Sequence, residues 1–218
     1  ILAYERPADP RSPWKTEVWN DAMHKTHNFD LVQTDADDAH ELLVGGKEGV
    51  FHLDRVNSHI ESHPLTFDER GGAGEVRAGK LSEKTRFIAT VEPMHGNHLV
   101  VSFPQKDDAG AVWRSQVLDD SLIDAHALAS ADFIGSGQDQ IVVGWRAMNR
   151  PGAKVGIKLF TALDSEGRVW SQTLIDDNSM ACEDLTVADL NGDGRLDIVA
   201  SGRATKNVKI YFNEGPKS

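Results

Sequence analysis

Cysteine is almost absent from this sequence, because Cys182 is the only one in 218 residues. A single cysteine excludes an internal disulfide and any zinc site built from several thiolates. Long apolar runs are also missing, and none approaches the roughly 18 residues that a membrane-spanning helix requires. We therefore expect no membrane segment in this chain.

Basic residues are too few to suggest a polyanion as partner. The chain has 23 Lys and Arg against 34 Asp and Glu, which gives a formal net charge of −11. Nucleic-acid binding depends on clustered Lys and Arg, so this balance argues against nucleic acid. It is compatible with cations and with neutral or basic ligands, such as a carbohydrate or another small polar molecule.

Internal repetition is what the sequence does contain. The residues VWRSQVLDD at 112–120 match VWSQTLIDD at 169–177, and the alignment continues without a gap at an offset of 57. A third copy begins at Trp14 with an offset of 99, and a weaker fourth copy lacks the acidic loop. We expect one domain over 1–218, with repeats at approximately 14–54, 74–102, 112–160 and 169–213.

Each copy consists of short runs rich in Val, Ile, Leu, Trp and Phe that are separated by Gly, Asp and Asn. This pattern is typical of β-strands. In the last copy the inner strand a is LTVADL, strand b is DIVASG, strand c is VKIYFN, and the outer strand d is of the type WSQTLI. Four strands in a period of about 45–57 residues predict the blades of a β-propeller.

The predicted strands do not divide evenly into blades. We count four a–b pairs, five c strands and four d strands, because the chain starts with the c-like ILAYERP and ends on a c strand. We therefore expect an all-β propeller with about four four-stranded blades present, as part of a longer propeller of about seven blades. The other blades, or a fused domain, would lie outside this sequence. A compact closed ring with fewer blades is the alternative.

One motif carries a family resemblance. The stretch ADLNGDGRLDIVASG at 188–202 resembles the FG-GAP, or VCBS-type, repeat of β-propellers. The units DAHALASADF and MACEDLTVADL are similar to the propeller of aldos-2-ulose dehydratases. Such repeats occur in integrin-like heads, polysaccharide lyases, lectin-like modules and sugar dehydratases. The resemblance implies an extracellular or periplasmic location.

The acidic loop of the last copy predicts a structural calcium ion. Calcium prefers six to eight oxygen ligands, and alternating acids in a tight glycine-containing loop turn successive side chains towards one point. In the resembled repeats the equivalent positions bind calcium; here they are the side chains of Asp189, Asn191, Asp193 and Asp197 and the carbonyl of Arg195. The alternative is a hydrogen-bonded Asx turn without an ion. The copy at 14–54 offers a weaker set, Gln33, Asp35, Asp37 and Glu41.

Polar residues converge at the opposite end of the predicted blades. The alignment makes His27 and His126 equivalent and places Glu183 at the same position in the last copy. The weak copy and the b–c loops add a further set, namely Glu75, Arg77, His95, Arg146, Arg203 and Trp145. Histidines and carboxylates from separate blades could bind a second divalent metal such as zinc or manganese, or act as acid and base. The alternative is a ring of charged residues that bind water and each other.

Together these features predict a carbohydrate-active propeller with its site at the mouth of the central channel. A lyase or dehydratase that works by β-elimination would use His27 and His126 as metal ligands or acid–base groups, with Glu183, Glu75 and His95 as further ligands or bases. The arginines would bind an anionic part of the substrate, and Trp145 would stack on a sugar ring. The alternative function is a non-enzymatic binding or scaffold module with structural calcium. We also expect Trp14, Trp113 and Trp170 to pack between blades.

Overall fold

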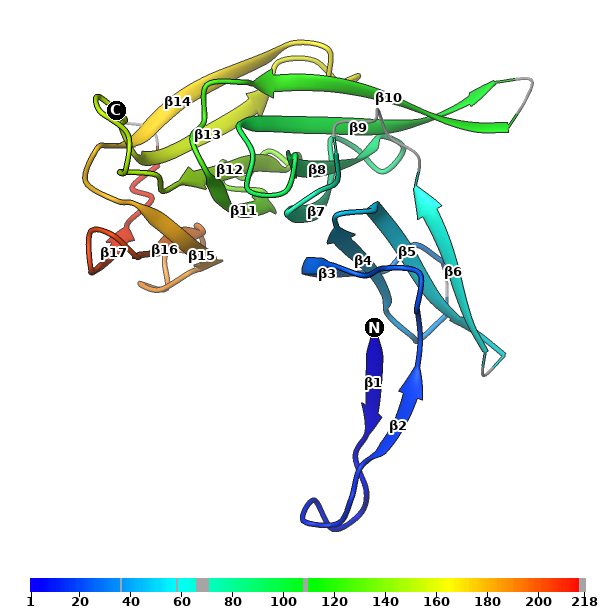
Figure 1. Cartoon of the computed structure of the whole chain (residues 1–218). Helices are drawn as coiled ribbons and strands as arrows, with labels where there is room; N and C mark the ends of the chain where they lie inside the picture. The colour runs from blue at the N-terminus through cyan, green and yellow to red at the C-terminus, as the bar shows by residue number, and fades with distance from the viewer. Residues whose placement is uncertain (36, 58, 66–70, 108–109, 216–218) are drawn as a thin grey trace.

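The computed structural model describes residues 1–215 apart from 36, 58, 66–70 and 108–109 (Figure 1). All regular secondary structure within these ranges consists of β-strands, as the repeats predict. This part of the chain accordingly contains no helix long and apolar enough to cross a membrane.

The strands form five antiparallel sheets in chain order. The first sheet pairs β1 (Leu2–Glu5) with β2 (Lys15–Val18). Three sheets of four strands follow: β3 (Thr26–Val32), β4 (Glu41–Gly46), β5 (Gly49–Val56) and β6 (His59–Leu65); β7 (Glu75–Lys80), β8 (Arg86–Glu92), β9 (His98–Asp107) and β10 (Gly110–Asp119); β11 (Ala125–Ala131), β12 (Gln140–Trp145), β13 (Gly156–Ala162) and β14 (Trp170–Asp177). The last sheet has three strands, β15 (Cys182–Ala188), β16 (Asp197–Gly202) and β17 (Asn207–Tyr211).

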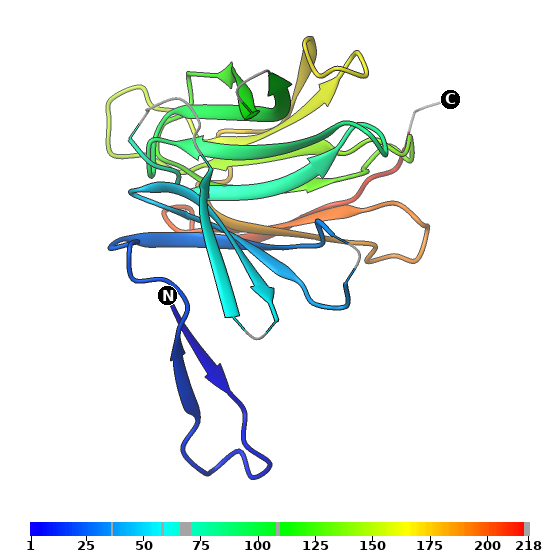
Figure 2. The same ribbon diagram turned by 90° about the vertical axis from the view of Figure 1, so that its right-hand side faces the viewer.

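The sheets are arranged as propeller blades. The first strand of each blade packs beside the first strand of the next, so that β7 contacts β3 and β11, and β11 contacts β15. Figures 1 and 2 show the blades following one another along the chain, with the β1–β2 hairpin projecting from the rest. The all-β propeller class with about four blades is therefore confirmed, and the strand inventory of the described residues equals the predicted one.

Alternation along the strands builds the core between the blades. On β11, Leu128 belongs to a buried cluster shared with the preceding blade, whereas Ala127 and Ala129 belong to a cluster shared with the following one. Successive side chains of a strand point to opposite faces, so one strand contributes to both interfaces. A Cβ at Gly144 would lie 2.5 Å from the Cβ and Sγ of Cys182, so a glycine allows these two blades to approach.

The predicted tryptophan positions hold for two of the three residues. Trp113 packs against the apolar cluster between the first two four-stranded blades, and Trp170 meets Phe87 edge-on with ring centroids 5.9 Å apart. The prediction is wrong for Trp14, which is 44% exposed and donates its indole N–H to Pro10 O. Trp14 precedes β2 in a sheet of only two strands, which gives it too little neighbouring surface for burial.

Candidate metal centre

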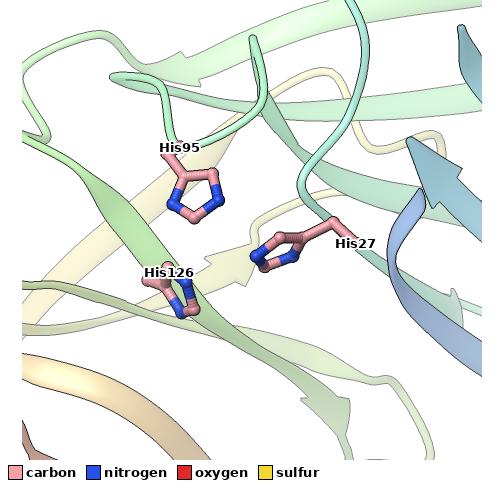
Figure 3. A group of neighbouring side chains, drawn as sticks. All are labelled: His27, His95 and His126. Atoms are coloured by element: carbon pink, nitrogen blue, oxygen red, sulfur yellow. The ribbon is translucent and has the colours of Figure 1, made fainter. Parts of the chain in front are cut away.

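Three histidines from three different blades meet at one end of the strands (Figure 3). His27 lies on β3, His126 on β11, and His95 in the turn between β8 and β9. The ring centroids are 4.4 Å apart for His27 and His95, 4.8 Å for His27 and His126, and 4.6 Å for His95 and His126. One ligand-capable atom from each residue lies within 4.8 Å of the others. The structure thus brings together two residues that the alignment made equivalent and a third from a b–c loop.

Register shifts at equivalent positions of three strands set the direction of the His27, His126 and Glu183 side chains. The pairing register shifts between Thr26 and Phe29 on β3, and between Ala125 and Ala127 on β11, so each shift encloses one of the histidines. The same shift encloses Glu183 on β15. A β-bulge locally re-aims a side chain, and bulges are over-represented beside functional sites. The repeat therefore reuses one backbone device three times at the inner end of strand a.

Backbone carbonyls set the tautomers of His27 and His126. The Nδ1 atom of His27 lies 2.6 Å from Gly74 O, and that of His126 lies 2.7 Å from Glu183 O. A carbonyl oxygen only accepts, so both Nδ1 atoms donate a hydrogen. A neutral imidazole that donates from Nδ1 keeps the lone pair on Nε2, which is how metal-binding histidines are usually held. Two imidazoles are therefore prepared as ligands.

The carboxylate of Glu75 supports His27 from behind. Its side chain is 2% exposed, lies 3.2 Å from His27 Nδ1, and accepts a hydrogen bond of 2.6 Å from Asn28 Nδ2. The bond to Glu75 raises the pKa of His27 above its usual value, although burial opposes the shift. Arg77 reaches the same carboxylate at 3.8 Å. Glu75 is thus placed to orient the imidazole of His27 from its Nδ1 side.

His95 has a different environment from the other two imidazoles. Its Nδ1 atom lies 3.0 Å from Arg146 Nη2 and 3.6 Å from Asp124 Oδ1. Burial lowers the pKa of His95, and the nearby charges of His27 and His126 lower it further. Asp124 stands two residues before His126 in the same motif but was not among the predicted site residues.

Two arginine side chains form ion pairs with the carboxylates of Asp124 and Glu183. Arg146 has an 11% exposed side chain, with Nη1 2.6 Å from Glu183 Oε2 and Nε 3.0 Å from Asp124 Oδ2. Burial alone would lower the pKa of Arg146, but these two carboxylates raise it. Arg203 is far more accessible, with 70% of its side chain exposed and one contact of 3.6 Å to Glu183. Arg203 therefore has more freedom than Arg146 to bind an anionic ligand.

The prediction that Trp145 stacks on a sugar ring is wrong. Trp145 is 7% exposed, belongs to the core between two blades, and donates its indole N–H to Lys154 O. The residue lies at the end of β12, where the alternation of the strand turns its ring into the protein.

A cavity of about 320 Å³ opens beside the arginines, lined by Asp124, Arg146, Ala147, Met148, Asn149, Arg203 and Ala204. A larger cavity of about 600 Å³ lies between the first two four-stranded blades, and none of the three histidines lines it.

The acidic loop of the last blade is closed by its own hydrogen bonds. Asp189 accepts from the backbone N–H groups of Gly192 and Gly194 at 2.7 and 2.9 Å, and both glycines have positive φ. Asp197 is buried and accepts from the Leu190 N–H, while Asp193 is bound by the guanidinium of Arg195. This geometry is that of the Asx-turn alternative. Calcium binding by Asp189, Asn191, Asp193, Arg195 and Asp197 stays a prediction.

A second gathering of acids lies in the first four-stranded blade. Carboxylate oxygens of Asp35, Glu41 and Asp54 come within 4.8 Å of one another. Asp35 and Glu41 were predicted from the sequence, whereas Asp54, which lies on the next strand, β5, was not. By contrast, Gln33 donates to Asp37 O and Ala39 O and so closes the loop.

The histidine centre fits a transition metal better than a hard cation. Imidazole nitrogen suits zinc, and catalytic zinc sites commonly use three protein ligands with a fourth position open to water or substrate. The carboxylates next to the histidines would then orient the imidazoles, and the arginines would bind an anionic group of the substrate.

The chain was compared with protein-family models and with curated proteins. No protein-family model matches the chain, and no curated protein matches it.

Proposed function

We propose that this chain is a carbohydrate-active propeller whose site is a divalent metal centre held by His27, His95 and His126. The observation that carries the proposal is the meeting of three imidazoles from three blades, two of them held with Nε2 lone pairs available. Zinc is the metal we favour over manganese, because manganese prefers carboxylate and water ligands. The FG-GAP-like motif and the likeness to aldos-2-ulose dehydratases add support for a sugar lyase or dehydratase.

The surrounding side chains suit β-elimination from a sugar with a carbonyl group. A bound metal ion would polarise the carbonyl oxygen and so acidify the neighbouring C–H. Glu183 would then take that proton, the electron pair of the broken C–H bond would form the C=C bond, and the oxygen on the neighbouring carbon would leave with a proton from solvent. Arg203 would hold a negatively charged group of the substrate in the cavity of about 320 Å³, which is within the size range of small-ligand sites.

A zinc titration tests the metal centre. Isothermal titration of the metal-free protein should give one tight site, which is lost in His27→Ala and in His126→Ala. His63→Ala is the matched control, because this side chain is 60% exposed and pairs with Glu61 on the same strand, β6. Equal zinc binding by all four proteins would overturn the proposal.

An elimination assay then separates enzyme from scaffold. The zinc-loaded protein should convert sugars that carry a carbonyl group into unsaturated products that absorb ultraviolet light, and Glu183→Gln should lower the rate while zinc still binds. If the loaded protein binds zinc but transforms no sugar, and only its melting temperature responds to the metal, the alternative holds. The chain would then be a binding or scaffold module with a structural metal.

A further inference from the structure

The Nδ1 atom of His95 has two neighbours with opposite hydrogen-bonding demands. Arg146 Nη2, at 3.0 Å, can only donate a hydrogen, and the Asp124 carboxylate, at 3.6 Å, can only accept one. Neither His27 nor His126 has such a choice, because their Nδ1 atoms face carbonyl oxygens. His95 is therefore the one imidazole of the three whose tautomer depends on which neighbour it pairs with.

The two pairings differ in what they leave for a metal. A neutral imidazole carries one ring hydrogen, so while Arg146 donates to Nδ1 the hydrogen stays on Nε2 and that atom has no lone pair. When Nδ1–H instead donates to Asp124, the lone pair of Nε2 becomes available. His95 then matches the state in which His27 and His126 are already held.

The backbone around this contact is unusual. Asp124 has φ +58° and His95 has φ +54°, both in the left-handed region that non-glycine residues rarely adopt. The aligned residues in the first and last copies, Lys25 and Ala181, do not have positive φ. The conformation is thus particular to Asp124 and is not a general property of this turn. Backbone strain of this kind clusters at functional sites.

We propose that Asp124 is the positioning residue of His95 in the metal-loaded state. Its Oδ1 atom accepts the Nδ1–H hydrogen bond, while its Oδ2 keeps the 3.0 Å contact with Arg146 Nε. The guanidinium of Arg146 stays anchored to Glu183 at 2.6 Å and releases the imidazole. The ring loses a proton from Nε2 to solvent and gains one at Nδ1, so the net protonation of His95 does not change. This inference rests on the proposed metal centre, whose three imidazoles Figure 3 shows.

Two substitutions of Asp124 test the inference on the full chain. Asp124→Asn removes the charge and tolerates the left-handed backbone, and Asp124→Gly removes the acceptor at a φ that glycine adopts freely. Loss of a hydrogen-bond partner behind a metal-bound histidine typically costs 10- to 100-fold in affinity. We expect zinc affinity to fall about 10-fold in Asp124→Asn and towards 100-fold in Asp124→Gly. Asp177→Asn, an exposed acid that pairs with Lys154, should leave the affinity unchanged.

A double-mutant cycle with His95→Asn shows whether the effect passes through the imidazole. If it does, Asp124→Gly should cause no further loss of affinity when His95 is already replaced. The visible spectrum of the cobalt-loaded protein should also change in Asp124→Gly in the same way as in His95→Asn, which a merely structural role would not produce.

The outcomes distinguish this inference from the function it deepens. If the unmutated protein binds no zinc, the metal centre itself is wrong. If it binds zinc, and both Asp124 variants bind equally well, the metal centre stands and the role of Asp124 is overturned. An equal loss with and without His95 would also overturn it, because Asp124 would then act through the fold.

Discussion

Asp176 on β14 is a buried carboxylate that is matched by specific donors. Its side chain is 4% exposed and accepts hydrogen bonds from Ser179, from Tyr211 Oη at 2.8 Å, and from Lys209 Nζ at 3.1 Å. Burial alone would raise the pKa of Asp176, but these bonds together lower it below its usual value. A group with a depressed folded-state pKa contributes stability above its unfolded-state pKa and loses it as the pH falls.

Replacing Asp176 should therefore lower stability in a pH-dependent way. Asp176→Asn leaves the ammonium of Lys209, whose side chain is 34% exposed, without its charge partner, which costs about 2 kcal/mol at neutral pH. The difference from the unmutated protein should shrink as the pH falls through the folded-state pKa of Asp176. Urea unfolding at several pH values measures it, with Asp177→Asn as the exposed control. A constant difference at every pH would contradict the role of the charge.

The pair of His27 and Glu75 should show the opposite pH dependence. The pKa of His27 is raised chiefly by its bond to Glu75, so the pair stabilises the metal-free protein fully below the unfolded-state value of about 6.5. That contribution is lost as the pH rises through the folded-state pKa. NMR titration should show a lower His27 pKa in Glu75→Gln, and the stability gap between the two proteins should narrow at alkaline pH. An unchanged His27 pKa would contradict the assignment.

Strands and loops show what the sequence can and cannot predict. The alternation of apolar residues and the repeat offsets predict all the strands of each blade, because burial on two faces imposes a regular pattern. They also make His27, His126 and Glu183 equivalent. The bulges that aim these side chains depend on the pairing of strands across the sheet, and no local pattern encodes them. Trp14 occupies the same position of the repeat as Trp113 and Trp170. It is exposed nevertheless, because its sheet has only two strands.

The loop of residues 189–197 offers a prediction at the scale of one element. If calcium binds there, Asp193 exchanges its contact with Arg195 for the ion, and the folded state gains about 3 kcal/mol at a calcium concentration a hundredfold above Kd. Thermal unfolding should then shift upward with calcium in the unmutated protein but not in Asp193→Asn. Asp132→Asn, in the equivalent loop of the previous blade, should keep the response. No shift in the unmutated protein would leave the loop as an Asx turn alone.

At the scale of the whole molecule, the blades gather residues that are far apart in the chain. His27 and His126 lie on β3 and β11, which flank β7 on either side, so the packing of first strands against one another determines how close the rings come. The sequence could predict this meeting from the repeat alone. It also predicted His95 as a further ligand, but not how close this ring comes to the other two, since the length and path of the β8–β9 turn follow no repeat. The contacts of His95 with Arg146 and Asp124 could not be predicted either, because they depend on the path of this turn.

The most direct test of the central claim is zinc-edge X-ray absorption on the protein loaded with one equivalent of zinc. Three histidine ligands predict imidazole scattering from about three nitrogens at roughly 2.0–2.1 Å. The histidine contribution should fall in His27→Ala and in His126→Ala and persist in His63→Ala. A spectrum without imidazole scattering, or one that none of these substitutions changes, would contradict the account.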